Sequence, residues 1–128
     1  MILDTCALLW LADASIRHNK ISAPTLELIN NSAVVYVSAI SGFEIGTMVG
    51  SSKLILPVSP AEWFDTILAF HHLELMDLTF EVCLRATQLP KIHEDPCDRF
   101  IIASALTFEM PVVTSDVRFK AYGVEVLC

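Results

Sequence analysis

Four acidic residues stand where apolar segments give way to segments of helical pattern: Asp4, Glu44, Asp98 and Asp116. Asp4 directly follows the apolar start of the chain, and Asp116 follows the run P-V-V-T-S. If these carboxylates converge, their mutual repulsion raises at least one pKa or demands a compensating cation. Mg²⁺ and Mn²⁺ prefer oxygen ligands and suit phosphate chemistry, so the pattern predicts a site for one of these ions.

Hydroxyl side chains accompany two of the acids. Thr114 and Ser115 precede Asp116, and Thr5 follows Asp4. A hydroxyl in this place can orient a water molecule or a phosphate oxygen. It can equally form a turn or a helix cap, which is the more common use of Ser and Thr beside a helix start.

Each acid also has a purely structural interpretation. The segment Ser41–Glu44 matches a capping box, and Asp95–Asp98 matches an N-cap followed by proline and a second acid. Asp116 can begin a turn, and either Asp4 or Thr5 can cap the first helix. The shared placement of the four acids favours a site, but the residues alone leave both interpretations open.

The elements that must position these acids alternate along the chain. Apolar and β-branched runs predict strands, and apolar residues at helical spacing predict helices. The predicted strands are 1–3, 33–37, 73–78, 112–113 and 124–127, and the predicted helices are 5–12, 22–31, 38–49, 59–71, 79–89 and a last one opened by Asp95 and Pro96. Such alternation predicts an α/β domain whose mostly parallel sheet is covered on both faces. Functional groups of these sheets gather at the carboxyl ends of the strands, where the four acids would lie.

Composition and charge narrow the class of protein. The chain has 128 residues, of which 54% are hydrophobic and 18% charged, which fits a single folded domain (1–128) and excludes intrinsic disorder. The longest uncharged stretch, Leu28 to Phe43, is interrupted by polar residues, so no membrane span is expected. The net charge is −7, so a basic footprint for nucleic acid is missing and nucleic-acid chemistry would need a bound cation.

Other motifs are missing from the sequence. It contains no H-x-x-x-H or C-x-x-C spacing, which argues against zinc, and no phosphate-binding glycine loop or nucleophile elbow. The four cysteines are expected to be free thiols in a reducing cytoplasm. His93 precedes the acids Glu94 and Asp95, and we assign it no role.

Four segments, in the same order along the chain as in a known family, resemble the motifs of that family: Leu3–Trp10, Val37–Ile45, Leu89–Ala103 and Val113–Asp116. Together they look like the PIN domain and, within it, the VapC-type toxins of bacterial type II toxin–antitoxin pairs. The stretch D-P-x-D-R-x-I-x-A is the most specific part.

The resemblance implies a three-layer α/β/α fold around a parallel five-stranded sheet of order 3-2-1-4-5. It implies a Mg²⁺- or Mn²⁺-dependent endoribonuclease that hydrolyses RNA phosphodiesters with a metal-activated water. The family's catalytic and metal-binding acids carry over onto Asp4, Glu44, Asp98 and Asp116, with Thr114 as the accompanying hydroxyl. The implied partners are RNA, a second copy of the chain and a VapB-type antitoxin, in the cytoplasm.

The sequence departs from the family pattern at a few positions. Cys6 and Cys97 replace residues that are often histidine and aromatic, and only three residues precede Asp4. Two other interpretations stay open: a catalytically silent module of the same fold that binds its partners, and another Mg²⁺-dependent, phosphate-handling α/β enzyme. RNA would be drawn by basic residues such as Arg17, Lys20, Lys53 or Arg99, although Arg99 is expected to pair with Asp95.

Overall fold

The sheet sits at the centre of the molecule and has five strands, all of them parallel to their neighbours. A computed structural model describes residues 1–13, 15, 16 and 18–128. The strand order β3-β2-β1-β4-β5 confirms the expected order. The strands are β1 (Ile2–Leu3), β2 (Val35–Ser38), β3 (Leu73–Met76), β4 (Val112–Val113) and β5 (Val126–Leu127).

Helices fill the connections, and most begin at a side chain that caps them. The oxygens of Ser22, Ser59, Thr79 and Asp95 each accept a backbone N–H of the first turn, and proline occupies the first turn of three of these helices. The helices are α1 (Thr5–Ala12), α2 (Ala23–Asn31), α3 (Ile40–Gly50), α4 (Pro60–Phe70), α5 (Phe80–Gln88), α6 (Pro96–Phe108) and the 3₁₀-helix η1 (Val117–Tyr122).

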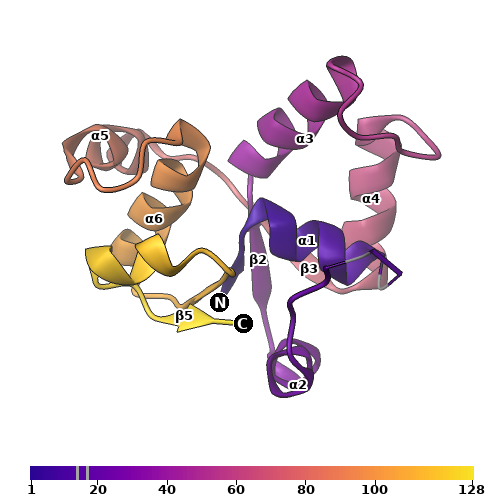
Figure 1. Ribbon diagram of the computed structural model, residues 1–128, viewed down its shortest axis with the longest axis horizontal. Helices are drawn as coiled ribbons and strands as arrows, with labels where there is room; N and C mark the ends of the chain where they lie inside the picture. The colour runs from indigo at the N-terminus through magenta and orange to yellow at the C-terminus, as the bar shows by residue number, and fades with distance from the viewer. Residues whose placement is uncertain (14, 17) are drawn as a thin grey trace.

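Two hydrophobic cores lie on opposite faces of the sheet. Ile2 belongs to the core with α5 and α6, whereas the next residue, Leu3, belongs to the core with α1 and α4. Val112 and Val113 divide in the same way, because successive side chains of a strand point to opposite faces. Figure 1 shows α5 and α6 on one side of the sheet and α1 and α4 on the other, which gives the expected three layers.

The sequence-based boundaries differ from the structure mainly at strand ends. The third strand ends at Met76 rather than at residue 78, and the last begins at Val126 rather than at 124. Short parallel strands suffice here because the central strand β1 pairs with β2 and β4 at once, through Leu3 opposite Val37 and Val113. The carboxyl ends of β1 and β4 therefore lie side by side.

One capping expectation is confirmed and another is wrong. Of the two candidates for the N-cap of α1, Asp4 holds the position, whereas Thr5 is the first helical residue and turns its hydroxyl toward α3. The capping box at Ser41 does not form, because α3 begins at Ile40 and its N-cap, Ala39, offers no side-chain hydrogen bond. Ser41 and Glu44 are thereby left to contact Thr5 instead. Across the part of the chain described, every helix is too short or too polar to cross a membrane.

Candidate functional site

Asp4 lies at the end of the central strand and is almost completely buried, with 6% of its surface exposed. Its Oδ1 accepts the backbone N–H of Ala7 at 2.7 Å, so it caps α1. Burial raises the pKa of Asp4, and the charges of Glu44 and Asp116 raise it further, against the lowering effect of hydrogen bonds from Thr114 and Ala7. Asp4 is therefore both a helix cap and a carboxyl group whose ionised form is disfavoured by burial and by nearby negative charges.

Thr114 joins the ends of β1 and β4. It is fully buried, its Oγ1 accepts the backbone N–H of Asp116 at 3.0 Å, and its hydroxyl hydrogen-bonds the carboxylate of Asp4. One hydroxyl thus fixes the position of Asp116 and the orientation of Asp4. The expectation that Thr114 accompanies the acids agrees with this placement, although its role remains a prediction.

Glu44 reaches the site from the second turn of α3. The Thr5 hydroxyl donates to its Oε1 at 2.6 Å, and the hydroxyl of Ser41 lies 2.9 Å from that of Thr5. Burial raises the pKa of Glu44, the hydrogen bond from Thr5 opposes this, and the charge of Asp95 adds to it. A chain of neutral hydroxyls, rather than a cation, steadies this carboxylate.

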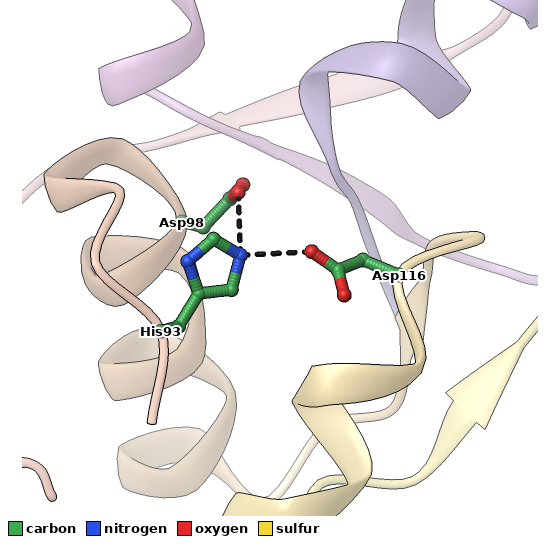
Figure 2. A group of neighbouring side chains, drawn as sticks. All are labelled: His93, Asp98 and Asp116. Carbon is green, nitrogen blue, oxygen red and sulfur yellow. Dashed lines mark hydrogen bonds and ion pairs between the residues drawn. The ribbon is translucent and has the colours of Figure 1, made fainter. Parts of the chain in front are cut away.

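Asp98 and Asp116 meet at the ring of His93 (Figure 2). Nε2 of His93 forms a hydrogen bond of 2.8 Å with Oδ2 of Asp116 and lies 3.0 Å from Oδ2 of Asp98. These three side chains each offer one potential ligand atom, and the three atoms lie within 4.8 Å of one another. Asp98 comes from the first turn of α6 and Asp116 caps η1, so two distant parts of the chain meet at one imidazole.

The pKa values of Asp98 and Asp116 are shifted in opposite directions. Burial, followed by the charge of Asp95, raises the pKa of Asp98 to about 7, while His93 opposes the shift and Glu44 and Asp4 add to it. Hydrogen bonds from the Arg118 guanidinium hold the pKa of Asp116 well below its usual range. Arg118 grips both oxygens of Asp116, with Nε 2.9 Å from Oδ1 and Nη2 2.7 Å from Oδ2.

The four predicted acids therefore lie at one edge of the sheet, where the charges of Glu44 and Asp116 raise the pKa of Asp4, and those of Glu44 and Asp4 raise the pKa of Asp98. Their donor set consists of carboxylate oxygens, which fits Mg²⁺ or Mn²⁺. Three of the four carboxyls have a raised pKa, so ionising them together is unfavourable without a counter-charge. Burial and the neighbouring acids also raise the pKa of Cys97 to about 11, so its thiol is protonated at neutral pH in the metal-free chain.

Sequence reasoning missed His93. Only 2% of its surface is exposed, although it belongs to a loop, and its ring packs edge-on against Phe119 with centroids 5.9 Å apart. The Tyr122 hydroxyl accepts the backbone N–H of His93 at 2.7 Å. The sequence signal was weak: a histidine two residues before the N-cap Asp95, in reach of that residue's backbone N–H.

Arg99 does not pair with Asp95, contrary to expectation. Its guanidinium instead donates to four backbone carbonyls, those of Ala86, Leu89, Pro90 and His93, at 2.8–3.2 Å. These carbonyls lie at the end of α5 and in the loop before α6, where α-helical partners are missing, so a fork of N–H donors satisfies them. Arg99 is therefore not available to RNA; Lys20 and Lys53 are exposed, and Arg17 lies outside the described residues.

Comparison with known proteins found relatives in sequence and in overall structure. The ribonuclease VapC22 of Mycobacterium tuberculosis is 25% identical over 123 residues, which cover 95% of this chain and 91% of the relative. A crystal structure of VapBC2 from Rickettsia felis, bound to a promoter DNA fragment, matches with a TM-score of 0.69 at 18% identity, over 98% of this chain and 97% of the other. A toxin–antitoxin complex from Klebsiella pneumoniae matches with a TM-score of 0.66 at 20% identity, over 99% and 95% of the two chains.

The solved structures share the fold of this chain, and the family assignment comes from its sequence. The family model described as PIN domain matches residues 1–125, almost the whole chain and all of the site described above. The chain therefore belongs to the PIN domain family.

Proposed function

We propose that this protein is a Mg²⁺- or Mn²⁺-dependent endoribonuclease and the toxin of a toxin–antitoxin pair. The observation that carries the proposal is the convergence of four carboxylates from separate segments, three of them with a raised pKa, at the carboxyl edge of the sheet. Family membership and the distant ribonuclease relative support the same activity.

In this proposal, Asp4, Glu44, Asp98 and Asp116 would hold the metal. When bound, the ion supplies positive charge for the phosphate and acidifies water, so that hydrolysis proceeds at neutral pH. Thr5 orients Glu44 through its 2.6 Å hydrogen bond, and Thr114 orients Asp4. Because Thr5 begins α1 and Thr114 directly follows β4, regular elements fix both partners and hold the carboxylates in place before substrate arrives.

The competing candidate is a silent binding module in which the acids serve only as caps. Asp4 and Asp116 do cap α1 and η1, which is the specific observation in its favour. Asp98, by contrast, is not an N-cap, because Asp95 holds that position in α6. Asp98 is therefore the residue at which the two functions differ most.

The test uses calorimetric Mn²⁺ binding and cleavage of single-stranded RNA by the native chain, by Asp98→Asn and by Asp65→Asn. Asp65 is an exposed acid of α4, so its variant matches the charge change away from the site. We expect Asp98→Asn alone to lose metal binding and cleavage. A native chain that ignores Mn²⁺, or an Asp98→Asn variant that cleaves normally, favours the capping module instead.

We further propose a VapB-type antitoxin and a second copy of this chain as partners. The similar solved structures include toxin–antitoxin complexes, which supports a partner of this kind. Large apolar side chains such as Leu26, Leu28 and Phe70 are exposed, and an apolar groove of about 640 Å³ lies between α1, α2 and the end of α4. Light scattering on the isolated chain tests the homodimer; a monomer at micromolar concentration contradicts it.

A further inference from the structure

His93 is held at every polar atom that it possesses. Its backbone N–H donates to the Tyr122 hydroxyl at 2.7 Å, and its carbonyl accepts from Arg99 at 3.2 Å. Its ring nitrogens face Asp95 on one side and the carboxylates of Asp98 and Asp116 on the other. A buried loop residue with this many fixed partners is positioned rather than merely enclosed, because each contact restricts a different degree of freedom.

The contacts determine where the ring proton lies. The backbone N–H of Asp95 donates to Nδ1 at 3.1 Å, so Nδ1 must present a lone pair. A neutral imidazole with an unprotonated Nδ1 carries its proton on Nε2. Nε2 faces Oδ2 of Asp116 at 2.8 Å and Oδ2 of Asp98 at 3.0 Å, and both oxygens are acceptors when ionised (Figure 2).

The same contacts determine whether His93 can be a metal ligand. Ligation through Nε2 requires the lone pair there and the proton on Nδ1. A proton on Nδ1 would face the N–H of Asp95, so two donors would meet at 3.1 Å and the existing hydrogen bond would be lost. The nearness of Nε2 to two carboxylate oxygens therefore reflects donation, not membership of the ligand set.

We propose that His93 is a positioning residue, which donates its Nε2 proton between Asp116 and Asp98 and holds these two carboxylates at the spacing that a shared divalent cation requires. This inference rests on the proposed function for its cation, but its hydrogen-bond assignment concerns the metal-free chain alone. It leaves the cation with oxygen ligands only, which suits Mg²⁺ and Mn²⁺. Partners that orient metal ligands typically change metal affinity by about 10–100-fold when removed.

The first measurement is the protonation of the His93 ring, by long-range ¹H–¹⁵N NMR at neutral pH before and after addition of Mg²⁺. We expect the proton on Nε2 in both states, because the N–H of Asp95 keeps Nδ1 as an acceptor. A proton on Nδ1 in the metal-free chain overturns the assignment. Loss of the Nε2 proton when Mg²⁺ is added overturns it as well, because the ring would then be a ligand.

The second measurement compares two substitutions that divide the ring's hydrogen bonds. The amide nitrogen of Gln in His93→Gln reaches the place of Nε2 and can donate to both aspartates, but nothing replaces Nδ1. The amide oxygen of Asn in His93→Asn reaches the place of Nδ1 and can accept from Asp95, but nothing donates to the aspartates. The pair is matched because each variant keeps one half of the ring's contacts.

We expect calorimetry to give His93→Gln a Mn²⁺ affinity close to that of the native chain and His93→Asn an affinity at least about tenfold weaker. Melting temperatures follow both variants, so that unfolding is not mistaken for lost affinity. Equal weakening in the two variants, or native affinity in His93→Asn, overturns the positioning role. A native chain that binds no Mn²⁺ overturns the proposed function, and the NMR measurement then decides the hydrogen-bond assignment by itself.

Discussion

The two halves of the acidic site balance their charge by different means. Around Asp4 and Glu44, the partners are neutral: the hydroxyls of Thr5 and Thr114 and a backbone N–H. Around Asp116, the guanidinium of Arg118 holds both carboxylate oxygens. The pKa values of Asp4 and Glu44, which have neutral partners, are raised, and the pKa of Asp116 is lowered.

Asp98 and Asp116 share His93 as a neighbour, but this does not give their carboxyls similar pKa values. Asp98 contacts the same Nε2 as Asp116, yet its pKa is raised to about 7. The difference comes from burial and from the acids around Asp98, against the full positive charge beside Asp116. Fixed hydrogen bonds orient carboxylates, but only a counter-charge makes their joint ionisation favourable, so a divalent cation would act chiefly on the three unbalanced acids.

The largest expected effect comes from removing the carboxyl of Asp98, whose pKa is raised to about 7 and whose negative charge has, among the described residues, no cationic side chain like Arg118 to offset it. Asp98→Asn should reduce RNA cleavage on the order of 100-fold, because the cation loses a carboxylate that no other residue replaces. Initial rates at saturating Mn²⁺ measure the loss, with Asp65→Asn as the charge-matched control. Cleavage within about threefold of native would mean that the balanced and unbalanced halves do not differ in function.

The next effect is on stability and its dependence on pH. The folded-state pKa of Asp98, about 7, exceeds the unfolded value of 3.8, so the folded chain binds this proton more tightly. Stability from this group is complete below pH 3.8 and is lost as pH rises toward 7. In metal-free protein, Asp98→Asn should therefore gain stability over native by about 2 kcal/mol near pH 7 but not near pH 4; this is roughly half of what the full pKa shift corresponds to, because solvent screens the partly exposed carboxyl.

Urea unfolding in the presence of a chelator, at several pH values, measures this difference. Asp116 acts with the opposite sign, since its lowered pKa gives stability above pH 3.8 that disappears in stronger acid. The prediction therefore concerns the difference between native and variant, in which the contribution of Asp116 cancels. A constant difference across the pH range contradicts it.

A smaller effect is expected where neutral hydroxyls do the balancing. Thr5→Val removes the donor to Glu44 and the contact with Ser41, and should cost about 1 kcal/mol of stability. Thr47→Val is the control, because Thr47 lies exposed on α3 and bonds only its own helix, at Phe43 O. Thermal unfolding of the two variants checks this. Equal losses would show that helix propensity, not the inter-helix hydrogen bond, is responsible.

The smallest effect comes from removing the cation that already balances Asp116. Arg118→Gln should strengthen Mn²⁺ binding by about threefold, because 55% of the Arg118 side chain is exposed and its charge is screened by solvent. Lys120→Gln changes the net charge equally, and Lys120 is exposed at the other end of η1. If both variants strengthen binding alike, the effect is general electrostatics and not release of Asp116.

The sequence predicted the fold better than it predicted the contacts within the site. The strand order followed from the family resemblance, and the edge that carries Asp4 and Asp116 followed from alternating apolar segments, because β1 and β4 are buried and regular. The residues that steady the acids could not be found in this way. His93 depends on Tyr122, 29 positions away, and Thr5 depends on Glu44, 39 positions away. Local patterns gave Thr5 a capping role and gave His93 none, because the partners of both residues are set by tertiary contacts.

The position of Arg99 has a consequence for how the chain tolerates change. It follows Asp98 on α6 but has different partners, since its planar guanidinium binds carbonyls at the end of α5 and in the loop that carries His93. Lysine could not replace it, because a single ammonium cannot span oxygens contributed by four residues. Two neighbouring residues of one motif thus have different roles: in the proposed function Asp98 would hold the metal, whereas Arg99 links α6 to the end of α5. A substitution of Arg99 would therefore leave all four acids in the sequence and still loosen the packing of α5, α6 and the His93 loop that positions Asp98.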